Sequence, residues 1–235
     1  MPKQKLQLYS VVSTKNPKFE KYNGLPRMSY SAYTSWNEES YIGSFIAAKF
    51  LGIPDPGNIF TEFGSGCGEW LETAGEKAAA LLSESDIEIL SSVEVFQDSE
   101  FEREIMIKRE NYCILGYIDE CHRDGVQLIT VTDFKTGGAK KKADYAGPDY
   151  NQTRLYAYGL EEEGEEIGYV GVELLHRKGN TLVPGDKNIL RLEGTIEKIP
   201  TPYVREETEE FLEKFDKTAK EISDHLVFYN KYFKD

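Results

Sequence analysis

Four short runs rich in β-branched and aromatic residues follow one another in the middle of the chain, and they constrain the fold more than any other feature. They occupy residues 93–96, 101–108, 112–121 and 126–134, and turn residues such as Arg123, Asp124 and Gly125 separate them. Short runs bounded by turn residues are typical of β-strands that pair with their neighbours in sequence. The pattern therefore predicts an antiparallel meander at the centre of the fold.

Apolar residues recur at helical spacing on both sides of this block. The spacing predicts helices over residues 31–51, from the glycine-rich segment 64–68 to about 82, over 148–163 and over 204–233, with extended segments at 167–176 and 189–199. Helices and strands mixed in this order favour an α/β fold with a mixed central β-sheet flanked by helices. Because no linker interrupts the pattern, we predict a basic lead-in over residues 1–28 and a single domain over residues 29–235 that ends in a C-terminal helix.

Composition excludes several classes of protein. The chain has 235 residues, of which 40% are hydrophobic and 12% aromatic. This is enough apolar material to close a core, so the chain is neither disordered nor fibrous. Its net charge of −13 opposes non-specific attraction to nucleic acid or anionic lipid, so any contact with DNA must be local.

Location is indicated by three features. No run approaches the roughly 18 apolar residues of a membrane-spanning helix, so we expect no membrane partner. Residues 1–12 lack the apolar core of a secretion signal. The three cysteines, Cys67, Cys113 and Cys121, are too few and too irregular for a disulfide framework. Together these features predict a cytoplasmic protein.

The most informative polar residues lie in and after the predicted strands. Gly116-Tyr-Ile-Asp119 is followed fourteen residues later by Asp133-Phe-Lys135-Thr-Gly137, and then by Gln152 and Tyr156. Side chains alternate along a strand, so Asp133 and Lys135 point the same way while Phe134 points to the opposite layer. Two carboxylates beside an amine form a hard-oxygen site suited to Mg²⁺ or Mn²⁺. The lysine ammonium can orient a metal-polarised water or stabilise charge on a phosphorane-like transition state.

Strand register provides a geometric condition for this site. If Asp124 and Gly125 were the central residues of a tight hairpin, Asp119 would face residue 130, and Asp133 would point to the other side of the sheet. Both aspartates reach one side only if a three- or five-residue loop, or a bulge, shifts the pairing near residues 123–127. The site therefore predicts such a loop.

These residues resemble the RecB-like branch of the PD-(D/E)XK nuclease superfamily over roughly residues 29–175. The resemblance is carried, in order, by Ser29-Tyr30-Ser31, the glycine-containing turn and helix over 63–72, Gly116-x-x-Asp119, Asp133-x-Lys135-Thr-Gly137 and Gln152-x-x-x-Tyr156. It implies a restriction-endonuclease-like core and hydrolysis of DNA phosphodiester bonds with Mg²⁺ or Mn²⁺. A chain of this size without a helicase segment resembles phage or bacterial exonucleases of recombination and repair.

The resemblance also implies roles for individual residues. Asp119 and Asp133 would ligate the ion, the main-chain carbonyl of Phe134 can add a ligand, Lys135 would position water, and Gln152 with Tyr156 would form a support pair near DNA. Where the family usually offers a histidine, this chain has Gly68-Glu69, which leaves Glu69 or Glu72 as the substitute ligand. The iron–sulfur cluster of some relatives needs cysteines near the C-terminus, and none follows Cys121, so we predict no cluster.

Other hypotheses remain open. Asp119, Asp133 and Lys135 could form a solvated surface ion pair, and charges such as Glu69 and Glu72 suit a helix start whatever the function. Lys140, Lys141 and Lys142 form the only dense basic run, either a solvated loop or a DNA-binding segment that tracks phosphates. Cys67 at a helix start could act as a nucleophile with His122 or His176. A structure-selective DNA endonuclease, or a non-catalytic nucleic-acid-binding protein with a degenerate site, would share the fold. A homo-oligomer or a recombination protein partner is also compatible with the sequence.

Overall fold

The computed structural model of the protein describes residues 25–51, 53, 58–75, 82–96, 98–123, 125, 127–179 and 190–232. Most of the predicted basic lead-in, residues 1–24, lies outside the described residues. The chain forms two compact units, each assembled from separate segments. They are Met1–Asp55, Glu104–Tyr117 and Val204–Asp235 for the first, and Pro56–Arg103 and Ile118–Tyr203 for the second. The single domain expected from residue 29 onward stays a prediction.

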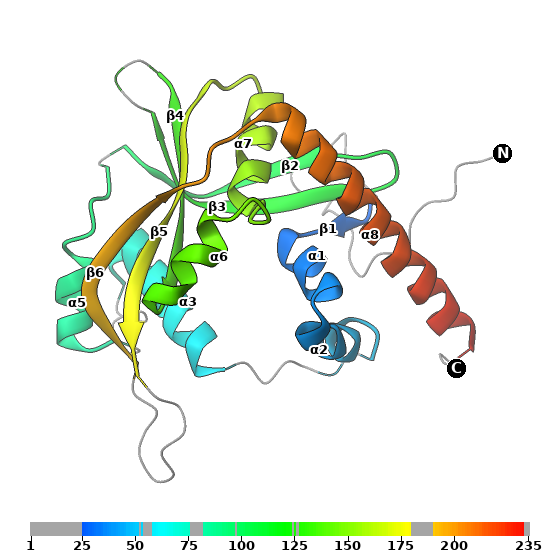
Figure 1. Ribbon diagram of the computed structural model, residues 1–235, viewed down its shortest axis with the longest axis horizontal. Coiled ribbons are helices and arrows are strands. Elements are labelled where there is room, and N and C mark those ends of the chain that lie inside the picture. Colours follow the sequence, from blue (N-terminus) through cyan, green and yellow to red (C-terminus); the bar gives the residue numbers. More distant parts are fainter. Residues whose placement is uncertain are drawn as a thin grey trace, which may run out of the picture. The chain divides into compact units, whose positions relative to one another are not determined.

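Aromatic packing holds the first unit together. It contains β1 (Arg27–Met28), α1 (Tyr30–Asn37), α2 (Glu39–Lys49) and α8 (Arg205–Tyr232), shown in Figure 1. Ser29 caps α1 by accepting a hydrogen bond from the Ala32 amide. The buried stripe of α8 then stacks on α1, with the rings of Tyr33 and Phe215 4.9 Å apart. The sequence pattern correctly predicted this long amphipathic helix.

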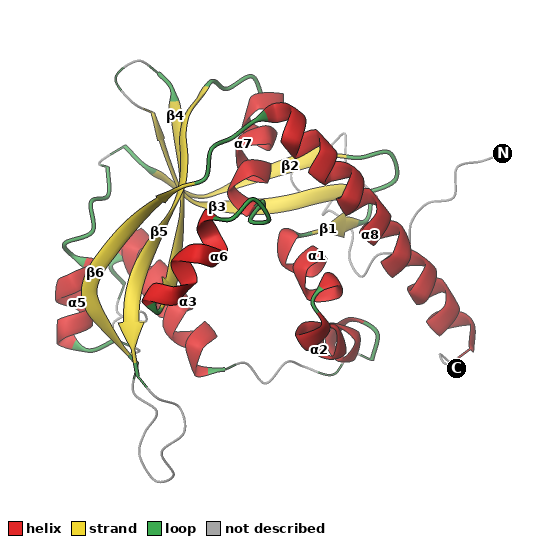
Figure 2. Ribbon diagram, in the orientation of Figure 1, coloured by secondary structure: helices red, strands yellow, loops and turns green. Residues whose placement is uncertain are grey.

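The second unit contains most of the sheet and the helices that pack on it. Its helices are α3 (Ile59–Thr73), α5 (Glu84–Leu90), the 3₁₀ turn η2 (Ala139–Lys141), α6 (Lys142–Ala146) and α7 (Gln152–Glu162). Its strands are β4 (Ile129–Gly137), β5 (Ile167–Lys178) and β6 (Arg191–Pro200), while β2 (Glu100–Lys108) and β3 (Cys113–Arg123) contribute residues to both units. Figure 2 shows these strands in yellow among the helices.

The sheet is mixed, as predicted. The described strands follow the order β1-β3-β4-β5-β6, with β2 also paired to β3. The β3–β4 and β5–β6 pairs are antiparallel, whereas β4 and β5 are parallel. A parallel pair needs a crossover connection, and α7 supplies it. Among the described residues, every helix is too short or too polar to span a bilayer.

The β3–β4 register satisfies the condition set by the sequence. Arg123 pairs with Ile129 and Glu120 with Thr132, so five residues connect the two strands. Continuing the same register by one pair sets Asp119 opposite Asp133. The pairing is therefore shifted by an odd number of residues from a tight hairpin, and both aspartates reach one side of the sheet. The prediction of a longer loop is confirmed.

Two predicted elements were wrong in the described structure. Residues 31–51 form two helices rather than one, because Glu38 between them has extended backbone (φ −97°, ψ 117°). The neighbouring Asn37 amide donates to Thr218 Oγ1 of α8 at 3.0 Å, so a tertiary contact fixes this corner. Residues 93–96 form no strand. The Phe96 amide donates instead to the Glu120 carboxylate, 3.3 Å away.

The helix that carries the glycine-rich segment begins earlier than predicted. α3 starts after Asn58, whose side chain accepts a hydrogen bond from the Thr61 amide, and the glycines lie inside the helix rather than before it. A Cβ added at Gly64 would lie 3.3 Å from Thr136 Oγ1, so this glycine permits close approach to β4. The helix ends at Thr73, before a left-handed Ala74 (φ 48°), whereas periodicity had extended it to about residue 82.

Candidate active site

Asp133 is the most enclosed of the predicted site residues. Its side chain is 0% exposed. One carboxylate oxygen accepts a hydrogen bond from Gln152 Nε2 at 3.1 Å, and the other accepts from Tyr150 Oη at 2.9 Å. Lys135 Nζ lies 2.7 Å from that second oxygen. Because a buried carboxylate is costly without partners, these donors are what keep Asp133 in place.

Asp119 faces Asp133 from β3. Its Oδ2 accepts a hydrogen bond from the Phe134 amide at 2.8 Å. Burial and the neighbouring charge of Asp133 raise the pKa of Asp119 to about 7, although Lys135 and the Phe134 amide act against that rise. A cation held between the two carboxylates would oppose this rise, because its positive charge favours the ionised form of Asp119.

Lys135 remains a cation despite its enclosure. Burial alone would lower its pKa, but the charges of Asp133 and Asp119 and the hydrogen bond to Asp133 raise the pKa above its ordinary value. Lys135 and Asp133 lie two residues apart on β4 and contact each other, as alternation along the strand predicts. Phe134, between them, packs into a separate cluster with Phe63 and Leu175. The two carboxylates and the amine therefore converge.

A pocket of about 490 Å³ opens beside these groups. Asp119, Phe134 and Lys135 line one side, and α3 forms the other with Gly64, Ser65, Gly68, Glu69 and Glu72. The α3 glycines have no side chain to fill this space, so the wall can lie close to the strands. Both glutamates proposed as substitutes for the family histidine therefore line the same pocket as Asp119.

Glu102 on β2 is a residue of the candidate site that the sequence motifs did not reveal. It lines the pocket. Burial raises the pKa of Glu72, and the charge and hydrogen bond of Glu102 raise it further, so these two carboxyl groups contact each other. Glu102 has φ +49°, an uncommon backbone conformation for a residue other than glycine. Strand periodicity does not reveal such a local deviation.

The predicted support pair meets at the start of α7. Gln152 Nε2 donates to Tyr156 Oη at 2.7 Å as well as to Asp133. Burial and the nearby charge of Asp133 raise the pKa of Tyr156, so its hydroxyl stays protonated. Tyr150, just before the helix, was not predicted, because no spacing rule associates it with Asp133. The half-buried amide of Gln152 thus has hydrogen-bond partners in Asp133 and Tyr156.

The donor set fits a hard divalent cation. Within the described parts of the chain, no three acidic, histidine or cysteine side chains are gathered closely enough to bind an ion by themselves. Mg²⁺ does not require such a cage, since it commonly keeps several waters and takes one or two carboxylates. Asp133 accepts bonds from three donors, and a carboxylate offers about four acceptor positions. Asp133 keeps one acceptor position but does not itself line the pocket, whereas Asp119, Glu69, Glu72 and Glu102 place carboxyl groups along it.

The basic run after β4 is partly neutralised. Lys141 Nζ lies 2.7 Å from Asp144, and Lys142 forms an ion pair with Glu197. Lys140 is exposed on η2. These three lysines lie beyond the end of β4 that carries Lys135, so they adjoin the candidate site without lining its pocket.

The cysteine hypothesis receives no support from the geometry. Cys67 is 1% exposed, and burial with the charge of Asp86 raises its pKa to about 12, so the thiol is neutral and enclosed. Cys67 lies inside α3 rather than at its start.

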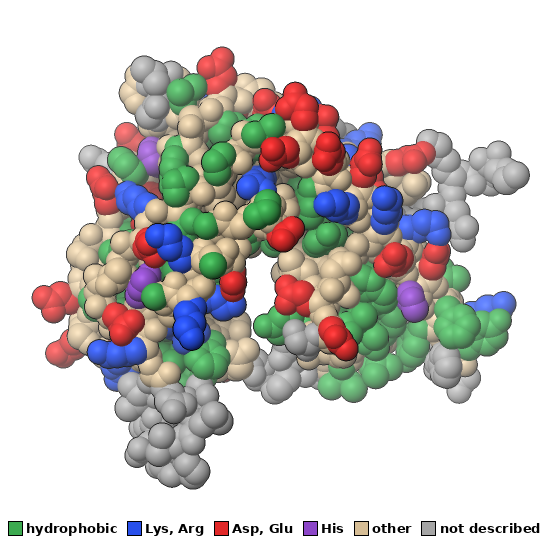
Figure 3. All heavy atoms as spheres, viewed as in Figure 1, with side chains coloured by type: hydrophobic (Ala, Val, Ile, Leu, Met, Phe, Trp, Pro, Cys, Tyr) green, Lys and Arg blue, Asp and Glu red, His purple; other side chains and the backbone are tan. Residues whose placement is uncertain are grey.

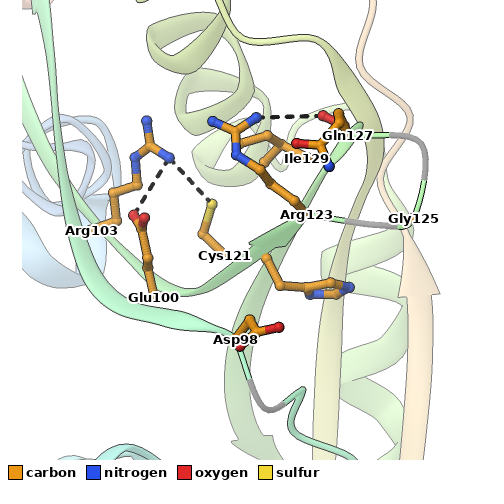
Figure 4. Close-up of a pocket in the computed structure, with 9 residues that line it drawn as sticks. Asp98, Glu100, Arg103, Cys121, Arg123, Gly125, Gln127 and Ile129 are labelled. Atoms are coloured by element: carbon orange, nitrogen blue, oxygen red, sulfur yellow. Dashed lines mark hydrogen bonds and ion pairs between the residues drawn. The ribbon is translucent and has the colours of Figure 1, made fainter.

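A second pocket, of about 510 Å³, lies beside the β3–β4 connection (Figure 4). Arg103 and Arg123 line it, and both form ion pairs with Glu165, at 2.9 and 2.7 Å. Cys121 also lines it, with Arg103 donating to its sulfur at 3.9 Å. The arginines of this pocket are therefore already paired with a carboxylate, as Lys135 is with Asp133 in the first pocket.

Comparisons with known proteins agree with this arrangement. A model of the PD-(D/E)XK nuclease superfamily matches residues 48–234. Among solved structures, the chain is similar to a protein from Eubacterium rectale provisionally named an exonuclease, with a TM-score of 0.50 and 11% identity over 95% of this chain and 88% of that one. A protein named SSO0001 is 16% identical over 80% of this chain and 85% of its own, but its TM-score of 0.28 is too low for argument. No curated protein matches the sequence. The predicted restriction-endonuclease-like fold is confirmed.

Proposed function

Because this chain belongs to the PD-(D/E)XK nuclease superfamily, we propose that it is a DNA exonuclease that hydrolyses phosphodiester bonds with Mg²⁺ or Mn²⁺. The observation that carries the proposal is the convergence of Asp119, Asp133 and Lys135 beside one pocket. Nucleic-acid hydrolysis follows from the family. The metal, the preference for DNA and the exonuclease mode are the proposed part.

Each site residue has a role set by its surroundings. Asp119, Asp133, the Phe134 carbonyl and either Glu69 or Glu72 would hold the ion. A bound divalent ion supplies polarisation of the phosphate and lowers the pKa of water. The Lys135 ammonium stabilises negative charge on the reacting phosphate and orients water beside it. Gln152 and Tyr150 fix the Asp133 carboxylate, and Tyr156 fixes the Gln152 amide.

The exonuclease mode is supported by the likeness to the provisionally named exonuclease, which extends over most of both chains. We place the activity in recombination or repair of linear DNA in a phage or bacterial cytoplasm, on the same resemblance. A DNA endonuclease would use the same side chains, but it would also cleave covalently closed circular DNA.

The test compares linear duplex DNA with covalently closed circular DNA of the same sequence, in Mg²⁺, in Mn²⁺ and in chelator. We expect progressive loss of the linear form only, and only with metal. Asp133→Asn and Lys135→Ala should each lower the rate by at least about a hundredfold, the size of effect seen when one charge-stabilising group is lost. Lys214→Ala, an exposed lysine of α8, serves as the matched control and should cut like wild type.

The outcomes separate the alternatives. Cleavage of closed circles would identify an endonuclease. A wild-type protein that binds DNA but cuts nothing in either metal would identify a non-catalytic protein with a degenerate site. Cleavage that persists in Lys135→Ala and Asp133→Asn would reject this site as the source of the activity.

A further inference from the structure

Arg177 on β5 is a cation without an acidic partner among the described residues. Its guanidinium carbon lies 4.3 Å from the centre of the Phe60 ring. Its Nε is buried and donates to no group in the described structure. The arginines of the second pocket differ, since Arg103 and Arg123 both bind Glu165. Arg154 also has no carboxylate partner among the described residues, but the carbonyls of Pro148 and Pro202 accept its hydrogen bonds, whereas Arg177 Nε has no acceptor there.

Position along β5 relates Arg177 to the candidate active site. In the parallel pairing, Lys135 lies opposite Leu174 and Gly137 opposite His176, so Arg177 lies one residue beyond this pair. Three strand residues span about 10 Å. The register of β5 with β6 shifts between Leu175 and Arg177, and such irregularities redirect side chains.

Helix α3 also connects Arg177 with the active-site pocket. Phe60, Gly64 and Gly68 are spaced by four residues and so lie on one helix face. Gly64 and Gly68 both line the active-site pocket, and the Phe60 ring contacts the Arg177 guanidinium. Phe60 lies four residues before Gly64, about 6 Å along the helix. Arg177 therefore lies beside the pocket on the same wall, about 10 Å along β5 from the residue that pairs with Lys135.

The chemistry of Arg177 itself favours an anion. Lys141 extends over Gly137, where an added Cβ would lie 3.1 Å from its side chain, but its ammonium is paired with Asp144. Figure 3 shows Lys and Arg side chains gathered over α6 and the adjoining parts of β5 and β6. Guanidinium presents its donors in a planar fork that matches a phosphate, and stacking on Phe60 holds that plane. A partly desolvated guanidinium without a counter-ion gains most from an anionic ligand.

We propose that Arg177, stacked on Phe60, is a phosphate-binding subsite that holds a non-reacting phosphate of the substrate strand. This inference rests on the proposed nuclease function. Because Arg177 lies beside the pocket without lining it, the phosphate that it would hold is not the reacting one. The phosphate is either internal to the strand or the terminal phosphate of a DNA end.

Binding measurements test the subsite without relying on cleavage. Labelled twelve-nucleotide single strands, with and without a 5′-phosphate, are titrated by fluorescence anisotropy with Ca²⁺ in place of Mg²⁺. Arg177→Gln should weaken binding by about tenfold or more, as expected for loss of charge-assisted hydrogen bonds. Arg177→Lys, which keeps the charge but loses the fork, should give a smaller loss. Lys178→Gln, at the exposed neighbouring residue, is the matched control and should bind like wild type.

The two substrates distinguish the source of the phosphate. An equal loss with both strands assigns an internal phosphate, whereas a loss confined to the 5′-phosphorylated strand assigns the terminal one. Wild-type affinity in both Arg177→Gln and Arg177→Lys, with unchanged melting temperatures, would overturn the subsite. Should the wild type bind strands through Arg177 yet cut none, the proposed nuclease function fails and the subsite stands.

Discussion

At the scale of single residues, the two aspartates differ in how firmly they are held. Asp133 has three donors and no exposure, whereas Asp119 accepts from one backbone amide. Asp133 therefore has a fixed orientation, and Asp119 is the carboxylate that can adjust to a ligand. Gln152 is important to this difference, because its single amide group donates to both Asp133 and Tyr156.

Replacing Gln152 with alanine should reduce the activity without unfolding the chain. Loss of a group that orients a ligand typically costs 10- to 100-fold in metal affinity or activity, and we expect a decrease of about that size. The measurement is the rate of DNA cleavage as a function of Mn²⁺ concentration, with thermal melting as the check on folding. Gln127→Ala, an exposed glutamine outside the site, is the control. A full wild-type rate in Gln152→Ala would show that Tyr150 and Lys135 suffice to orient Asp133.

The sequence predicted some of these residues and missed others for physical reasons. Asp119, Asp133 and Lys135 were found because short motifs carry their chemistry. Their convergence required the register, which depends on a five-residue connection that composition does not determine. Glu102 and Tyr150 were missed because each reaches the site through tertiary packing, without a fixed spacing from the motifs.

At the scale of elements, the sequence pattern predicted helices and strands correctly where they are long and have one apolar face. It predicted β2 to β6, α7 and α8 to within a few residues. It failed at α3, since glycines that suggest a turn instead allow a helix to approach β4 closely. It also missed the short helices α5 and α6. The signal for α5 was present in Ser83 and Asp86, which form a capping box.

Asp86 should be a main determinant of stability in the second unit. It is 0% exposed, and besides capping α5 it accepts a hydrogen bond from the Leu192 amide of β6 at 2.7 Å. Asp86→Ala would leave that amide and the Ser83 amide without a partner. We expect a loss of about 2–4 kcal/mol in the free energy of unfolding, measured by urea denaturation. The exposed neighbour Glu88→Ala should change stability by less than about 0.5 kcal/mol. A loss of that small size in Asp86→Ala would mean that water replaces the carboxylate.

The cluster of Arg103, Arg123 and Glu165 should make stability depend on acid pH. Burial acts to raise the pKa of Glu165, but hydrogen bonds from Arg123 and Arg103 outweigh it and lower the pKa below its usual value of 4.5. A carboxyl with a lowered folded pKa stabilises the protein above its unfolded pKa, and that contribution is lost as pH falls through the folded value. Wild type should therefore be more stable than Glu165→Gln at pH 6.

This difference between wild type and Glu165→Gln should shrink as pH falls below 4.5, because Glu165 then binds a proton in the unfolded chain first and, at lower pH, in the folded protein as well. Urea denaturation of the two proteins at pH 6 and at the lowest pH where both fold measures it. Glu162→Gln, at an exposed residue nearby, provides the control for a general change in charge. A constant difference across this range would show that the arginines stabilise Glu165 and its amide analogue equally.

At the scale of the whole molecule, charge limits how the protein can bind a polyanion. The net charge of −13 repels DNA at long range, so binding must come from a few cations at the site. Lys135, Lys140 and Arg177 are the described candidates. The basic lead-in adds six Lys and Arg residues in the first 28, in a part of the chain where local pattern predicts little regular structure. If DNA contacts one or the other of these two groups of cations, its affinity should depend differently on salt concentration.

If only the cations near the site contact the strand, affinity for single-stranded DNA should depend weakly on salt. Each phosphate contact contributes about −0.7 to the slope of log affinity against log salt, so three contacts give roughly −2. Anisotropy titrations between 50 and 200 mM salt, an interval over which the slope is readily resolved, would measure it. Arg177→Gln should make the slope shallower by about 0.7, the share of one phosphate contact. A wild-type slope steeper than about −5 would instead require the lead-in to bind DNA, and neutralising its lysines would then restore the shallow slope.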